Sequence, residues 1–388
     1  MTVVREELGR IARYQQGLAA KGLDGALVLP AVDLYYLAGT RQNAVLWVPA
    51  AGAPILLVRK SFARAKDEAA PGDVRPFPSS KELAAVLGAK GKVGVAFDVV
   101  PAATVEWWRR VLPGAELVDA SAILREQRQV KSAAELAIMR DGGKRISAAI
   151  GEAPSFLRAG MREIDVAAEV EARLRRAGNG GTPRVRGFNA ELFVGLAVAG
   201  DSASAPGYFD GPVVGRGVDA ANPVGASRRE VRRDEPVILD YTAVFGGYVL
   251  DMTRVAVVGA LSAELLRAFD AALAIQEEVA RGLVPGAIGQ DLWEKAKAKA
   301  EALGLGGNFM GPPGDQVRFV GHGVGLELDE LPVLAPGFKA PLAAGMTVAV
   351  EPKFVFPGVG AVGIENTWVV TEKGGERLTV LPDAILEA

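Results

Sequence analysis

A segment of charged helix recurs in this chain after 126 residues, and this repeat constrains the fold more than any other feature. The first copy lies between Gly160 and Gly178 and is expected to begin at Asp165. The second lies between Gly286 and Gly304 and is expected to begin at Asp291. Two unrelated helices that end at common glycine terminators would give the same pattern. A duplicated unit of helix and strand would instead have pseudo-twofold symmetry, with a site between its halves. We take the duplicated unit as the prediction.

The first third of the chain alternates helical and extended patterns, as an α/β domain does. Residues 4–21 are expected to form a helix. Short apolar runs predict strands at 23–31, 44–48, 54–58 and 93–100. The pattern changes at Ser132, which has Glu135 at the spacing of a capping box and therefore predicts a helix start. We expect one domain over residues 1–125 and a second over 126–388.

Two predicted strands joined at Gly246 and Gly247 carry a pair of acids. A two-residue turn there would pair Thr242 with Asp251. Asp240 would then be a diagonal neighbour of Asp251 on the same face, roughly 7–8 Å away between backbones. The two carboxylates could therefore converge on one small volume.

The same construction recurs near the C-terminus, where a turn around Pro357 would place Glu351 opposite Glu365. Like charges directly opposite each other destabilise a sheet, and burying unpaired carboxylates costs about several kcal/mol each. Positive charge must therefore balance the four acids. Either an ion-pair network supplies it, with Lys353 and Arg254 nearby in the sequence, or metal ions do.

His322, the only histidine of the chain, favours the metal interpretation. A lone histidine is more often a hydrogen-bonded core or surface residue. Here it lies in the segment GHGVG, whose glycines allow close backbone approach, and the acids already require cations. Four carboxylates balance two divalent ions, and an oxygen-rich set with one imidazole suits Mn, Fe, Co or Zn. Two ions about 3.5–4 Å apart would activate a water molecule and polarise a substrate oxygen.

Four motifs resemble those of the M24 (pita-bread) metallopeptidases, the family of aminopeptidase P, prolidase and creatinase. DYTAVFGGYVLDMTR resembles the signature "D, ten residues, D-x-T-R", and GHGVGLELDELP resembles GHGIGLxxHExP. GMTVAVEP resembles GMxxTxEP, and VGIEN resembles VRIEN. The resemblance spans nearly the whole chain. It implies an α/β creatinase-type N-terminal domain over 1–125 and an α+β pita-bread catalytic domain over 126–388, with an internal pseudo-twofold repeat.

The resemblance also implies a site with two divalent metal ions, manganese first, with Zn, Co or Fe as alternatives. It implies five metal ligands: Asp240, Asp251, His322, Glu351 and Glu365. Asp329 and Glu330 would be the catalytic acid–base candidates. The family usually forms homodimers, so we expect one here.

Three positions depart from the family pattern. The second histidine of HExP is Asp329 here, and the arginine of VRIEN is Gly363. An upstream histidine is also missing, and its place is taken by Ala221 in one alignment and by Gly207 in another. In the family's peptidases these histidines contact the substrate and support the tetrahedral intermediate. The departures therefore weaken the inference of Xaa-Pro peptidase activity more than the inference of a metal site.

Three functions remain open at this point. The first is a hydrolase resembling Xaa-Pro aminopeptidase and prolidase, with Asp329 as the replacement acid–base group. The second is an enzyme on the same scaffold that acts on a non-peptide small molecule, as creatinase and the sulfonium-compound lyases do. The third is a metal-binding pseudoenzyme. Retention of all five ligands favours an enzyme.

The composition of the chain excludes some classes of binding partner. The chain has 44 basic and 46 acidic residues, a net charge of -2, without the basic footprint that nucleic-acid binding requires. The longest mostly apolar run, residues 44–58, is interrupted by prolines and a glycine and falls short of the ~20 residues of a membrane helix. The chain has no cysteine, which excludes disulfides and is compatible with a reducing cytoplasm. We expect a soluble, cytoplasmic protein with a small-molecule or short-peptide substrate.

Overall fold

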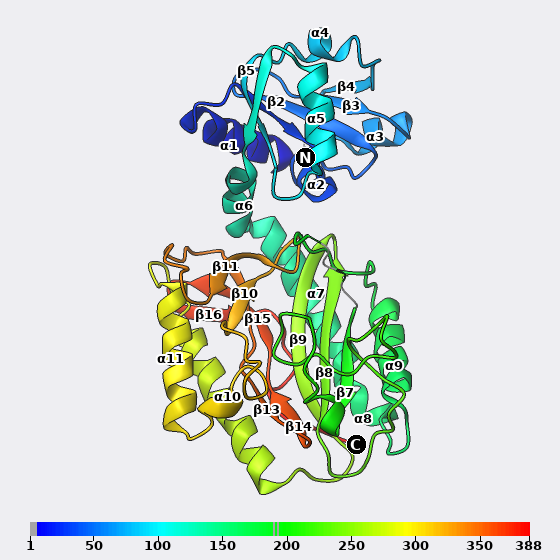
Figure 1. Ribbon diagram of the computed structural model, residues 1–388, viewed down its shortest axis with the longest axis vertical. Coiled ribbons are helices and arrows are strands. Elements are labelled where there is room, and N and C mark those ends of the chain that lie inside the picture. Colours follow the sequence, from blue (N-terminus) through cyan, green and yellow to red (C-terminus); the bar gives the residue numbers. More distant parts are fainter. Residues whose placement is uncertain (1–5, 189–190, 192–193) are drawn as a thin grey trace. The chain divides into compact units, whose positions relative to one another are not determined.

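The computed structural model describes residues 6–188, 191 and 194–388. These residues form two compact units (Figure 1). One contains the described residues through Arg128 together with 186–188, and the other contains Gln129–Val185 and the described residues from 191 onward. The boundary that the sequence predicts, after residue 125, falls inside helix α6 (Ser121–Gln129).

The first unit is built around a six-stranded sheet of order β4-β3-β2-β1-β5-β6. Strand β2 is antiparallel to both of its neighbours, and the other pairs are parallel. The strands are β1 (Gly25–Val28), β2 (Ala44–Pro49), β3 (Ile55–Val58), β4 (Asp73–Pro76), β5 (Gly91–Val95) and β6 (Ala115–Asp119). Besides α6, the helices are α1 (Glu6–Ala20), α2 (Ala31–Ala38), α3 (Phe62–Glu68), α4 (Leu83–Leu87) and α5 (Ala102–Val111). The expected α/β class is confirmed.

The first half of the second unit packs helices on a four-stranded sheet of order β17-β9-β8-β7. Its strands are β7 (Gly195–Ala199), β8 (Val237–Phe245), β9 (Tyr248–Val257) and β17 (Leu386–Glu387). Its helices are α7 (Ala133–Gly151), α8 (Ala153–Phe156) and α9 (Glu163–Arg176), with the 3-10 turn η1 (Gly200–Ser202) after β7. Helix α7 begins with the expected capping box, in which Ser132 and Glu135 each accept a hydrogen bond from the other's backbone N–H.

The second half has a five-stranded sheet of order β11-β10-β12-β15-β16 and a separate hairpin of β13 and β14. The sheet contains β10 (Gly321–Gly323), β11 (Glu330–Leu334), β12 (Thr347–Val350), β15 (Asn366–Thr371) and β16 (Gly374–Arg377). The hairpin joins β13 (Lys353–Phe356) to β14 (Gly360–Gly363). The helices are α10 (Ala263–Arg281) and α11 (Gly289–Ala302), with the 3-10 turn η2 (Gly306–Asn308).

The repeat expected from the sequence is present at the level of helices. Helices α9 and α11 both have 14 residues, and their bounds differ by the 126 residues of the repeat. The glycines before them, Gly160 and Gly286, both have a φ of 87°, and the glycines after them, Gly178 and Gly304, have φ values of 96° and 74°. These left-handed conformations favour glycine. Figure 1 shows α10 and α11 on one side of the second unit and α9 on the other, with the long strands β8 and β9 between them.

The apolar core of the second unit is shared by both halves. Ile238 and Val255 from the first half and Val348 and Phe354 from the second are fully buried in one cluster with α10 and α11. Acids on these strands are therefore carried into an apolar environment. None of the helices in the described part of the chain combines the length and apolarity that a bilayer crossing requires.

Candidate metal centre

The hairpin of β8 and β9 places Asp240 and Asp251 on one face. Its turn, Gly246 and Gly247, has φ values of 55° and 91°, which glycine adopts without a Cβ clash. The strands pair Thr242 with Asp251, so Asp240 is the expected diagonal neighbour. Asp251 is buried, whereas the Asp240 side chain is 20% exposed. The two acids thus lie at the inner and outer sides of one site.

Glu351 and Glu365 lie opposite each other, between two strand pairs. Val350 pairs with Asn366 on one side, and Lys353 pairs with Gly363 on the other. An isolated β-bridge joins Thr253 of β9 to Glu365 and brings this segment against the first hairpin. The four acids predicted from the two sequence segments therefore meet where the two halves of the unit meet.

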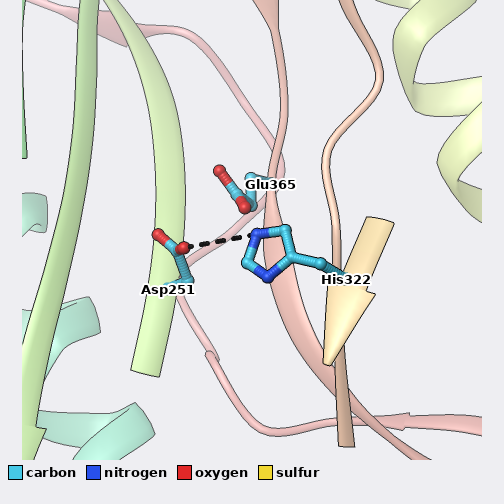
Figure 2. Close-up of side chains that lie close together, drawn as sticks. All are labelled: Asp251, His322 and Glu365. Carbon is cyan, nitrogen blue, oxygen red and sulfur yellow. Dashed lines mark ion pairs between the residues drawn. The ribbon is translucent and has the colours of Figure 1, made fainter. Parts of the chain in front are cut away.

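His322 approaches the acids from the central part of the second sheet, on β10. Its Nδ1 lies 3.0 Å from the carbonyl oxygen of Leu328. Because a carbonyl only accepts, Nδ1 carries the proton in the neutral ring and Nε2 presents its lone pair. Nε2 lies 3.8 Å from Asp251 Oδ2 and 3.4 Å from Glu351 Oε1. The imidazole is thus oriented as a metal ligand would be (Figure 2).

Three side chains form a set that fits a divalent ion. One donor atom each from Asp251, His322 and Glu365 lies within 4.8 Å of the others (Figure 2). Asp251 Oδ1 and Glu365 Oε1 are buried and accept no hydrogen bond. Buried carboxylate oxygens without partners are costly. A cation bound by these three residues would balance the charge of both carboxylates, and one imidazole with two carboxylates suits a transition metal or zinc.

The ammonium group of Lys353 completes the cluster. Its Nζ lies 2.7 Å from Glu351 Oε2 and 3.0 Å from both Glu365 Oε2 and Asp240 Oδ2, and the side chain is 0% exposed. Arg254 bonds instead to Asp383, at 3.1 Å, and to the backbone oxygen of Glu365, at 3.0 Å. The ion-pair and metal interpretations, which the sequence left as alternatives, are therefore combined in one site.

Burial and the neighbouring charges shift the pKa values of the cluster. Burial and the neighbouring carboxylates raise the pKa of Asp251 well above its ordinary value. Burial also raises the pKa of Glu365, to about 7, against the opposing effect of Lys353. Burial opposes the charge of His322, but the hydrogen bond and charge of Glu351 raise its pKa to about 10. For Glu351, the charges of Lys353 and His322 outweigh burial and lower the pKa to about 2.

Two threonines position the ligands, and sequence reasoning missed both. Thr253 Oγ1 donates to Glu365 Oε2 at 2.7 Å. Thr367 Oγ1 accepts from the backbone N–H of Asp251 at 3.0 Å and donates to its carbonyl oxygen at 2.9 Å. Thr253 could have been found, since it is the threonine of D-x-T-R. Nothing in the sequence near Thr367 signals its role.

The structure places Asp329 and Glu330 differently from each other. Asp329 is exposed in the turn before β11. Glu330 is buried, lies 3.0 Å from Lys131 Nζ and accepts the backbone N–H of Glu327 at 3.1 Å. This turn also presents the carbonyl oxygen of Leu328 to His322. Glu330 therefore holds the turn that orients the imidazole, whereas Asp329 lies at the surface.

The departures from the family pattern lie on loops and on β14. Ala221 and Gly207 are both exposed in the long segment between η1 and β8. The backbone N–H of Ala221 donates to Asp219 Oδ1 in a tight turn. Gly363 lies beside Lys353, whose Cγ would be 2.6 Å from a Cβ built at that glycine. The space that a side chain at 363 would take is filled by the lysine.

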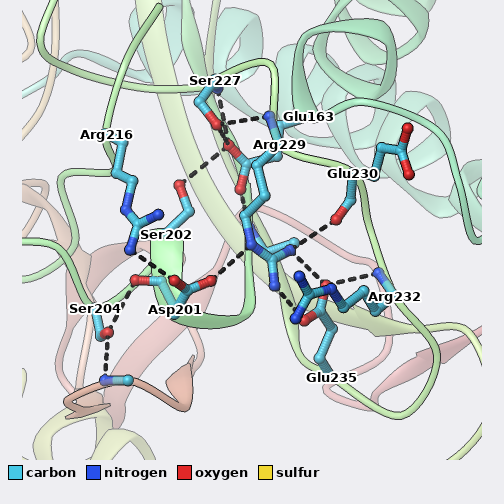
Figure 3. A network of polar contacts seen from close by, with 12 residues as sticks. Glu163, Asp201, Ser202, Ser204, Arg216, Ser227, Arg229, Glu230, Arg232 and Glu235 are labelled. Atoms are coloured by element: carbon cyan, nitrogen blue, oxygen red, sulfur yellow. Dashed lines mark hydrogen bonds and ion pairs between the residues drawn. The ribbon is translucent and has the colours of Figure 1, made fainter.

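A network of polar contacts anchors the long segment before β8 (Figure 3). Buried Glu163, at the start of α9, accepts hydrogen bonds from the backbone N–H of Ala199 and from the hydroxyl of Ser202. It also accepts both the backbone N–H and the hydroxyl of Ser227. Arg229 contacts Asp201 and Glu235 in the same network. Sequence reasoning used this helix only as part of the repeat and missed Glu163.

Comparison with known proteins identifies the family and the fold. A model described as "Metallopeptidase family M24" matches residues 137–372, and one described as "Creatinase/Prolidase N-terminal domain" matches residues 10–130. The chain is 28% identical to the probable dipeptidase PepE of Mycobacterium tuberculosis, over 97% of this chain and 95% of that protein. It is 24% identical to the Xaa-Pro dipeptidase of Pyrococcus furiosus, over 97% and 98%. The solved Xaa-Pro dipeptidase of Bacillus anthracis has a TM-score of 0.85 at 24% identity and covers 98% of this chain and 100% of its own.

Proposed function

Because the chain belongs to metallopeptidase family M24, we propose that it is a metal-dependent hydrolase that cleaves the amide bond of a short, dipeptide-sized substrate. One observation carries the proposal: Asp251, His322 and Glu365 converge, and two of their buried oxygens accept no hydrogen bond. The names of the relatives support the substrate class, since they include a probable dipeptidase and an Xaa-Pro dipeptidase.

In this proposal the metal ion is held by Asp251, His322 and Glu365, with manganese as the first candidate and Zn, Co or Fe as alternatives. When bound, such an ion polarises the substrate carbonyl and activates a water molecule. Asp240 and Glu351 complete the five-residue set that the sequence predicts. The expected number of two ions remains a prediction. Asp240 and Glu351 also form ion pairs with Lys353, and these ion pairs compete with the binding of a second metal ion.

The chain's own residues prepare this chemistry by holding the ligands still. The carbonyl oxygen of Leu328 keeps the proton of His322 on Nδ1. Thr253 holds one oxygen of Glu365. We assign Glu330 a positioning role, because its carboxylate is bonded to Lys131. Asp329 remains the acid–base candidate. Because its side chain is exposed, a bound substrate would have to shield it from solvent.

The absence of the family's other histidines should lower the rate of peptide hydrolysis. His322 is the only imidazole of the chain, and it faces the acids, so no second imidazole can donate to an oxyanion. Loss of one such donor typically costs ~100–1000-fold in rate. We therefore expect turnover of Xaa-Pro dipeptides to be weak at neutral pH. The homodimer and the cytoplasmic location stay predictions that rest on the resemblance and on the absence of cysteine.

The test is hydrolysis of a dipeptide panel, Xaa-Pro members included, by the protein reconstituted with Mn²⁺. We expect activity that chelation abolishes and that Asp251→Asn lowers by ~100-fold or more, because loss of outer partners of a metal ligand alone costs ~10–100-fold. Asp270→Asn, at an exposed position on α10, is the control and should keep full activity. Metal-dependent turnover of non-peptide amides alone would favour the small-molecule alternative. No metal-dependent turnover of either class would refute the proposal.

A further inference from the structure

We infer that Lys353 occupies the position of a second metal ion, so that the centre binds one divalent ion and uses the lysine ammonium as its second cation. The inference deepens the proposed function and rests on its metal site. It proposes one ion and one lysine in place of the two ions that the sequence predicts against four acids. Lys353 was considered from the sequence only as part of an alternative to metal.

The first argument for this inference is that three carboxylates already contact Nζ of Lys353. Asp240, Glu351 and Glu365 each direct one oxygen at the ammonium, at 3.0, 2.7 and 3.0 Å. A second ion would need oxygens from these same carboxylates. The oxygens without a hydrogen bond, Asp251 Oδ1 and Glu365 Oε1, are carried by two residues of the three-residue set with His322, and neither contacts the ammonium. One cation position is therefore filled by the chain itself, and one is left for a metal ion.

The second step is that the lysine is held in place. Its side chain is 0% exposed. Its stem fills the space beside Gly363, where a Cβ would be 2.6 Å from Lys353 Cγ. Its backbone is paired with Gly363 in the β13–β14 hairpin, and its carbonyl oxygen accepts the N–H of Met310 at 2.9 Å. Moving the ammonium away would open this packing and expose buried carboxylates to one another.

The third argument is the balance of charge in the buried site. Lys353 and one divalent ion contribute three positive charges toward the four of the carboxylates. A second divalent ion beside the lysine would leave an excess of positive charge. It would also put two cations against the same oxygens in a buried site, where repulsion is poorly screened. The arrangement therefore favours one ion with Lys353 in place.

The experiment counts ions and tests whether they interact. The full-length protein is reconstituted with Mn²⁺, freed of excess metal, and measured by elemental analysis and electron paramagnetic resonance. We expect one Mn²⁺ per chain, with the spectrum of isolated ions. Lys353→Ala frees the three oxygens and should raise the count to two, with a spin-coupled spectrum. Lys339→Ala, at an exposed position, is the control and should stay at one.

Each outcome decides the inference. Two coupled ions in the unaltered protein would overturn it while leaving the proposed function intact. A count of one in a folded Lys353→Ala protein would also overturn it. No bound metal would overturn both. If Lys353→Ala does not fold, anomalous scattering at the manganese edge from crystals of the unaltered protein decides. The inference requires one peak, at Asp251, His322 and Glu365, and a peak at the ammonium position would overturn it.

Discussion

Glu365 makes contacts on every side of the proposed metal centre. One of its oxygens is bonded to Thr253 and Lys353, and the other is buried without a hydrogen bond. Its backbone bridges to β9, so it joins the two halves of the second unit. Burial, opposed by Lys353, raises its pKa to about 7 from an ordinary value of 4.5. Between pH 4.5 and about 7, Glu365 is therefore protonated in the metal-free folded protein and ionised in the unfolded chain.

This proton predicts how the metal-free protein responds to pH. A carboxyl group with a raised pKa in the folded state contributes its stability below the unfolded pKa and loses it as pH rises through the folded value. The chelated protein should therefore lose stability between pH 4.5 and about 7, by up to ~3 kcal/mol from this group. Urea unfolding at a series of pH values measures it.

Glu365→Gln, which cannot ionise, should reduce that slope, while Asp251, whose pKa burial also raises, keeps part of it. Glu372→Gln, at an exposed position, should leave the slope unchanged. Stability that rises across the interval in the unaltered, metal-free protein would show that the burial of Glu365 has been misjudged.

Single residues also show how far the sequence could predict the site. The position of Asp240 relative to Asp251 followed from a two-residue glycine turn and the two-residue period of a strand. The role of Lys353 did not follow, because its proximity in sequence to Glu351 says nothing about which way the side chain points. Thr367 depends on contacts between residues 116 positions apart, which no local pattern contains.

At the scale of elements, local patterns were sufficient for helices and hairpins and insufficient for the long connection before β8. Helix α9 begins at Glu163, two residues before the expected start at Asp165. Asp165 lies in the first turn, and its carboxylate accepts the backbone N–H of Arg162 at 3.4 Å. An acid in the first turn of a helix therefore marks a start that lies slightly upstream of it. The connection between η1 and β8 has no periodic pattern, and it is held by the network around Glu163 and Arg229 (Figure 3).

That network predicts an element-scale effect. Glu163 is 1% exposed and accepts four hydrogen bonds. In Glu163→Gln, the amide N–H₂ would point at groups that themselves donate hydrogen bonds. We therefore expect the free energy of unfolding to fall by about 2–3 kcal/mol. Proteolysis between η1 and β8 should become faster. Glu169→Gln, on the same helix with a 47% exposed side chain, should change stability little. Equal stability of the two variants in urea unfolding would show that the network does not anchor the segment.

At the scale of the whole molecule, the residues of the proposed metal centre come from both halves of the second unit. Asp251 comes from β9 in the first half, whereas His322 and Glu365 come from the second half. An ion bound by all three would link the halves, and its binding free energy would add to the stability of the folded state. The repeat of α9 and α11 was predictable because glycine spacing is visible in the sequence. The meeting of the halves was not, because it depends on packing between strands more than 100 residues apart.

The most direct measurement of the central claim is the thermal unfolding midpoint of the chelated protein as Mn²⁺ is added. Binding to the folded state alone should raise the midpoint by about 5–10 °C at ~100-fold excess over Kd. Asp251→Asn and Glu365→Gln should lose most of the increase, while the control Asp270→Asn should keep it. A midpoint that does not change with Mn²⁺, Zn²⁺, Co²⁺ or Fe²⁺, or that rises equally in all three variants, would contradict a metal centre at Asp251, His322 and Glu365.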